Sequence, residues 1–154
     1  MRHHPQPEHD IITDDGGAEL QQAFSLLLPI RRQRLRRCER LQRQAEQALS
    51  DMQRQTDEAE QQLDTARQHY QQLREGFAGH HQSGLQKQEH LVGGLIRERQ
   101  ASDAVSGQRH QLQQRRAQQV TQQQQVQHAR QQTQARLRDV EKLEYLMAHS
   151  EALR

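Results

Sequence analysis

Apolar residues recur at a seven-residue spacing over much of the first half of the chain. Steps of seven from Leu35, and parallel steps from Cys38, give thirteen positions, of which eleven are apolar. The exceptions are Gln42 and Thr56, and the positions between are almost all Gln, Arg, Glu or Asp. A heptad seam sustained in this way predicts a coiled-coil helix. The thirteen positions are Leu35, Cys38, Gln42, Ala45, Leu49, Met52, Thr56, Ala59, Leu63, Ala66, Tyr70, Leu73 and Phe77.

The second half of the chain carries a weaker seam. Steps of seven from Leu91 lead to Met147, and companion positions run from Ala101 to Leu143, but several hold Gln, Glu or Arg. The stretch 113–125 is close to a polar tract, so we expect this arm to be less stable than the first. The positions are Leu91, Glu98, Ala101, Val105, Gln108, Leu112, Arg115, Gln119, Gln122, Val126, Ala129, Thr133, Arg136, Val140, Leu143 and Met147.

Glycines between the two seams predict a bend. The segment 76–84 is the best turn candidate, whereas a bend at Gly93-Gly94 would make the arms more nearly equal. We therefore expect a loose tip within 76–94, with arms over about 29–75 and 95–150. The predicted fold over 18–154 is all-α, a long antiparallel two-helix coiled-coil hairpin. The alternative is two helices that each pair with copies of themselves in a parallel dimer.

The N-terminal residues 1–17 are polar and turn-prone and predict a disordered tail. Residues 18–28 follow, with Leu20, Phe24, Leu27 and Leu28 at spacings that fit one apolar stripe of a short helix. Pro29 then either starts the next helix or kinks a continuous one.

Composition agrees with a thin helical assembly. Only 31% of the 154 residues are hydrophobic and 3% are aromatic, which is too little for a thick core, while 32 residues are Gln, a good helix former. The longest apolar run is far shorter than a bilayer span, and the N-terminus has no signal-peptide pattern. We therefore expect a cytoplasmic protein without membrane insertion.

An arginine-rich segment over residues 31–43 is the densest charge feature. It holds seven Arg and one Glu, a composition that suits docking to an acidic protein or to phosphates, although a solvated helix face is the simpler interpretation. No aromatic residues interleave with the arginines, so nucleic acid is not the expected partner. The candidate partner-binding residues here are Arg31, Arg32, Arg34, Arg36, Arg37, Arg40 and Arg43.

The C-terminal stretch 140–149 is the most apolar part of the second arm, and a hairpin would place it beside residues 26–40. This apolar excess predicts either a partner contact or a better-packed coiled-coil end. Glu141, Glu144 and Tyr145 are the candidate partner-binding residues of this stretch.

Catalytic and metal-binding patterns are not found in the sequence. The ten His are scattered, and none forms a helical pair with a carboxylate of the kind that binds zinc. Cys38, the single cysteine, can form no internal disulfide and is read as a small seam residue. A two-helix rod offers no concave pocket, so we expect no enzyme activity, no metal and no cofactor.

The order of features along the chain resembles a known family. A basic helix start over residues 28–40 leads into a long Gln/Glu/Arg heptad arm and a polar tip. A second arm follows and ends in Glu141-Lys142-Leu143-Glu144-Tyr145-Leu146. Over residues 28–150 the chain looks like the YscO/HrpO proteins of type III secretion systems, which are similar to flagellar FliJ. The resemblance implies a hairpin like the central stalk of rotary ATPases.

The implied partners are the hexameric export ATPase, the membrane export gate and export chaperones, at a cytoplasmic location peripheral to the secretion apparatus at the inner membrane. The arginine-rich segment and the C-terminal stretch would then lie near the ATPase ring, and the tip would face the gate. Two other functions remain open: a generic parallel coiled-coil scaffold or tether, and an Arg-rich nucleic-acid adaptor, whose binding would fall steeply with salt.

Overall fold

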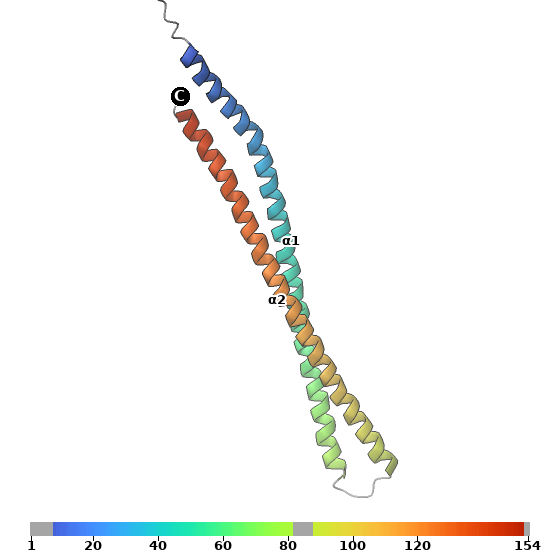
Figure 1. Cartoon of the computed structure of the whole chain (residues 1–154). Helices are drawn as coiled ribbons and strands as arrows, with labels where there is room; N and C mark the ends of the chain where they lie inside the picture. The colour runs from blue at the N-terminus through green and yellow to red at the C-terminus, as the bar shows by residue number, and fades with distance from the viewer. Residues whose placement is uncertain (1–7, 82–87, 153–154) are drawn as a thin grey trace, which may run out of the picture. The chain divides into compact units, whose positions relative to one another are not determined.

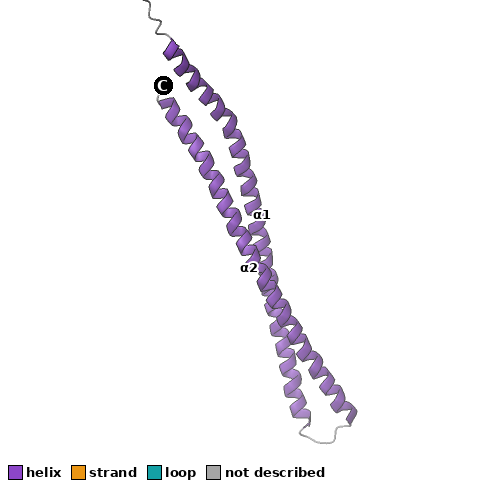
Figure 2. Ribbon diagram, viewed as in Figure 1, coloured by secondary structure: helices purple, strands orange, loops and turns teal. Residues whose placement is uncertain are grey.

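The computed structural model describes residues 8–81 and 88–152, and the side chains of residues 16–76 and 88–150. Two α-helices account for all of this described chain: α1 spans Glu8–His81 and α2 spans Gln88–Ala152 (Figure 1). The helices run antiparallel and pack against each other, and Figure 2 shows both in one colour as helix throughout. The prediction of an all-α antiparallel hairpin is therefore confirmed.

Helix α1 begins earlier than the sequence pattern predicted. Residues 8–17, expected to belong to a disordered tail, are helical, while residues 1–7 lie outside the described residues. Gly16 and Gly17 lie at the end of that expected tail and inside α1. A glycine costs about 1 kcal/mol relative to alanine inside a helix, so a pair of them weakens a helix without ending it.

The bend is also narrower than expected. Helix α1 continues through Gly76 to His81, and α2 begins at Gln88, so only residues 82–87 of the predicted tip 76–94 lie outside the described residues. The alternative bend at Gly93-Gly94 is wrong, because both glycines lie inside α2 and are half-buried there.

Pro29 lies inside α1, which continues through it as one helix. The structure thus selects the continuous helix over a helix start at this residue. Proline has no N–H to donate to the carbonyl of Ser25, one turn earlier, and its ring crowds that turn. The hydroxyl of Ser25 donates in turn to the carbonyl oxygen of Gln21 at 2.8 Å. Both features weaken the regular hydrogen bonding of this part of α1.

The predicted seam of α1 is the face that packs. Of its thirteen positions, the twelve whose side chains are described are all buried or half-buried, and Phe77 lies outside that set. The same seven-residue phase extends toward the N-terminus through Leu28 and Arg31, which are half-buried as well. The apolar segment 18–28 was predicted as one stripe, but it divides: Phe24 and Leu28 face the seam, while Leu20 and Leu27 are exposed.

The seam of α2 agrees with its predicted positions, with three exceptions. Leu91, Arg115 and Arg136 are exposed, and the other positions are buried or half-buried. An arginine cannot leave its charge in a narrow apolar seam without a partner, so it turns outward. Arg115 Nη1 donates to the Gln55 side-chain oxygen at 2.9 Å, and Arg136 lies 3.6 Å from the Asp139 carboxylate.

The hairpin divides into two compact units. The turn unit is Glu46–Gln125, and the terminal unit joins Met1–Ala45 to Val126–Arg154. In the turn unit, Ala59 and Leu63 of α1 form a buried cluster with Leu112 of α2, and Val105 packs against it. In the terminal unit, the buried residues are Val126, Val140 and Leu143 of α2, and Leu143 is only 2% exposed.

Contacts between the helices have the same register inside each unit. In the terminal unit, Arg31 contacts Asp139 and Arg32 contacts Glu144. In the turn unit, Arg115 contacts Gln55 and Arg116 contacts Glu60. The residue numbers of the first contact in each unit add up to 170, and those of the second add up to 176. One antiparallel pairing of the two heptad patterns therefore accounts for both units.

Candidate partner-binding surface

The seven arginines of segment 31–43 fall into distinct groups, because successive residues of a helix point 100° apart. Arg31 comes seven residues before Cys38 and so occupies the seam. It is half-buried, and its Nη1 donates to the backbone carbonyl oxygen of Asp139 at 2.8 Å. Arg31 therefore links the two helices of the terminal unit, a contact that its sequence position did not predict.

Arg32 and Glu144 were both predicted to bind a partner, and the structure brings them to each other. The Arg32 Nη2 and Glu144 Oε1 atoms lie 3.1 Å apart, and about half of each side chain is exposed. An exposed pair of this kind contributes up to about 1 kcal/mol and is weakened by salt. The pair was not predictable from the sequence, because it depends on the register of the two helices.

The other five arginines of the segment are exposed. Within the described residues none of them forms an ion pair. They are Arg34, Arg36, Arg37, Arg40 and Arg43. Three of these side chains line an open groove of about 550 Å³ on α1, together with Gln33 and Glu39. Glu39 is the single carboxylate in that lining, so the groove presents net positive charge.

On α2, Glu141 and Tyr145 are exposed, as a partner-binding role requires. Tyr145 is 68% exposed, and its ring stacks on that of His149 with 5.9 Å between the centroids and an interplanar angle of 5°. An exposed aromatic pair is a good anchor for a partner, since aromatic side chains combine large contact area with few rotatable bonds.

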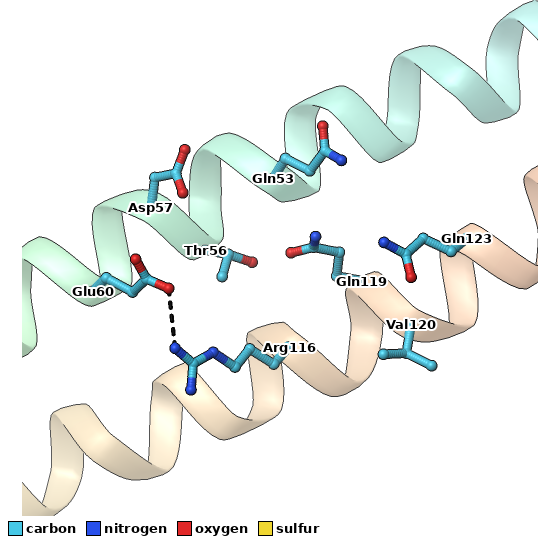
Figure 3. A pocket seen from close by; sticks show the side chains of 8 residues that line it. All are labelled: Gln53, Thr56, Asp57, Glu60, Arg116, Gln119, Val120 and Gln123. Atoms are coloured by element: carbon cyan, nitrogen blue, oxygen red, sulfur yellow. Dashed lines mark hydrogen bonds and ion pairs between the residues drawn. The ribbon is translucent and has the colours of Figure 1, made fainter.

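A second open groove, of about 500 Å³, lies between the helices of the turn unit (Figure 3). The groove is lined by four residues of α1, Gln53, Thr56, Asp57 and Glu60, and by four of α2, Arg116, Gln119, Val120 and Gln123. An ion pair of 3.0 Å joins Glu60 to Arg116. Seven of the eight lining residues are polar. This groove is the structural counterpart of the polar tract that the sequence showed over 113–125.

Several apolar residues are exposed, and most of these positions were not predicted individually, although the stretch 140–149 was predicted to carry an apolar excess. In the terminal unit they include Leu20, Leu26, Leu27, Ile30 and Leu146, and in the turn unit they include Leu91, Val92, Leu95 and Ile96. The signal was available for the first group, because Leu20, Leu27 and Leu41 are themselves spaced at multiples of seven.

The described residues contain neither a cluster that could hold a metal ion nor a helix that could cross a membrane. Among the described residues, no three His, Cys, Asp or Glu side chains come close enough together to hold a metal ion. Neither helix, over the part that is described, contains a stretch apolar and uncharged enough to cross a membrane. Compared with protein-family models, curated proteins and solved structures, the chain matches none of them.

Proposed function

We propose that this chain is a non-enzymatic coiled-coil stalk protein of a type III secretion export apparatus. In this role it docks to the hexameric export ATPase, couples it to the export gate protein and contacts export chaperones. It works at the cytoplasmic side of the inner membrane, peripheral to the apparatus. The resemblance of residues 28–150 to the YscO/HrpO family motivates the proposal, and the antiparallel hairpin is the fold that this family implies.

The observation that carries the proposal is a set of arginines in the terminal unit that are exposed and form no ion pair within the described residues. Arg36, Arg40 and Arg43 point away from the seam and line one positive groove, which suits a ring of carboxylates on a partner. Glu141 and Tyr145 of α2 add an acidic and an aromatic contact in the same unit. Because the hairpin closes its own seam, these groups need not be used for folding.

The test is binding of the full chain to a purified type III export ATPase, followed by sedimentation and by ATP hydrolysis. We expect a complex that the triple change Arg36→Gln, Arg40→Gln and Arg43→Gln weakens about tenfold, since three charge contacts are removed. The matched control is Arg97→Gln, Arg99→Gln and Arg109→Gln, three exposed arginines of the turn unit, which should bind like the unchanged chain.

Binding of the unchanged chain to DNA distinguishes the export role from the nucleic-acid adaptor role. If the chain fails to bind the ATPase but binds duplex DNA with an affinity that falls steeply with salt, the export role is wrong and the adaptor role replaces it.

A further inference from the structure

Helix α1 carries a second heptad stripe that nothing in the described chain covers. Leu20, Leu27 and Leu41 each stand one residue before a seam position, and Ile30 follows Leu27 by three. All four are between 41% and 51% exposed. Scattered exposed leucines are ordinary on a protein surface, but apolar residues that keep the spacing of a coiled coil form a second face for helix packing.

The stripe lies on one flank of the terminal unit. Arg32 and Glu144 each stand four residues after a seam position, and their ion pair marks the opposite flank. On α2, Leu146 stands one residue before the seam residue Met147, on the same flank as the stripe, and is exposed. The numbers of Leu27 and Leu146 add up to 173, within the register of the unit, so both helices present leucine at the same level.

We infer that the N-terminal part of this stripe, Leu20, Leu27 and Ile30 of α1, together with Leu146 of α2, docks an amphipathic helix of another protein whose apolar seam is flanked by carboxylates. The heptad spacing specifies a helix as the occupant, because seven-residue periodicity matches the rows of side chains that a second helix presents. The inference concerns a different face from the groove of Arg36, Arg40 and Arg43, and it does not depend on the export role.

Charge selects the kind of helix. Arg34 follows Leu27 by seven and Arg37 follows Ile30 by seven, so both continue the stripe, and within the described residues neither forms an ion pair. An occupant that covers Leu20, Leu27 and Ile30 therefore meets, about one and two turns beyond Ile30, two guanidinium groups that form no ion pair within the described residues. Carboxylates at that level would form bidentate pairs with them.

A second copy of the chain fits the stripe poorly. In a parallel pairing Arg34 meets Arg34, and in an antiparallel pairing centred between Ile30 and Arg31 it meets Leu27. Neither arrangement brings a carboxylate of the second copy's stripe opposite Arg34. An amphipathic acidic helix covers the apolar residues with its own apolar face and pairs its carboxylates with Arg34 and Arg37.

The probe for the test is a synthetic helix of about four heptads with Leu at both seam positions and Glu at the flanking positions. We expect it to bind the full chain in fluorescence anisotropy. The same peptide with Lys in place of Glu should bind at least about tenfold more weakly, because the arginines repel it. Arg34→Gln with Arg37→Gln should remove most of this difference between the two peptides.

The apolar contribution is tested by Leu20→Gln, Leu27→Gln and Ile30→Gln together, which should weaken the acidic peptide at least about tenfold. The matched control changes Val92, Leu95 and Ile96, three exposed apolar residues of the turn unit, to Gln and should bind normally. Circular dichroism confirms that each variant remains helical.

Four results would overturn the inference. The first two are absence of peptide binding and equal binding of the acidic and basic peptides. The third is a dimer in light scattering that becomes a monomer in the stripe variant. The fourth is stripe-dependent binding to vesicles of equal phosphatidylglycerol and phosphatidylcholine in place of the peptide. The third would assign the stripe to a second copy, and the fourth to an anionic membrane surface.

Discussion

Polar residues occupy several seam positions, and the structure shows different ways of accommodating them. Thr56 is 6% exposed, and its hydroxyl donates to the carbonyl oxygen of Met52 at 3.0 Å. Thr133 does the same with Ala129 at 3.0 Å. Gln108 differs: its side-chain oxygen is buried and accepts no hydrogen bond from the described chain. The threonines satisfy their hydroxyls within their own helix, which the longer glutamine amide does not do here.

Replacing Gln108 by leucine should therefore stabilise the turn unit. The change removes an unsatisfied buried oxygen and adds apolar surface to the seam, so the free energy of unfolding should rise by about 1 kcal/mol. Urea unfolding followed by circular dichroism measures this. Gln124→Leu, at an exposed outward position of the same helix, is the control and should change little. A loss of stability in Gln108→Leu would mean that the amide has a role in the seam.

At the scale of the helices, the sequence predicted which face of each helix packs better than it predicted where the helices begin and end. The face of α1 followed from the spacing of Leu35, Leu49 and Leu63, because only one face of a helix can meet a partner helix. The same phase places Arg31 on the seam, a signal that its membership of an arginine-rich segment obscured. The start of α1 and the limits of the tip could not be predicted, since glycine weakens a helix by an amount that neighbouring packing can offset.

The candidate surface was only partly predictable for a related reason. Exposure of Arg36, Arg40 and Arg43 follows from their heptad positions. The pairing of Arg32 with Glu144 depends on how the two arms align. Sequence periodicity fixes which face packs but leaves the register open.

Pro29 gives a test of α1 as a single element. Pro29→Ala restores an N–H for the carbonyl of Ser25 and removes the ring from the preceding turn, a difference of about 3 kcal/mol in a helix interior. Hydrogen exchange should show that the amides around residues 22–34 become more protected by tenfold or more. Gln33→Ala, an exposed change on the same helix, should leave protection nearly unchanged. Unchanged exchange in Pro29→Ala would mean that a helix starts at Pro29.

At the scale of the whole molecule, the distinction that matters most is between a chain that closes its own seam and one that pairs with a copy. A hairpin leaves its outer faces, including the unpaired arginines and the second stripe, available to other proteins. A parallel dimer would place each residue beside its own copy and would support only a scaffold or tether. The cross-helix contacts in both units belong to the first arrangement.

Chemical cross-linking tests this directly. In a Cys38→Ser background, Glu60→Cys and Arg116→Cys replace two side chains that contact each other at 3.0 Å. A short bis-maleimide should join the two cysteines within one chain, giving a monomer with altered gel mobility, and Glu60→Cys alone should give no cross-linked product. If Glu60→Cys alone instead yields a covalent dimer, like residues lie side by side in a parallel coil, and the hairpin is wrong.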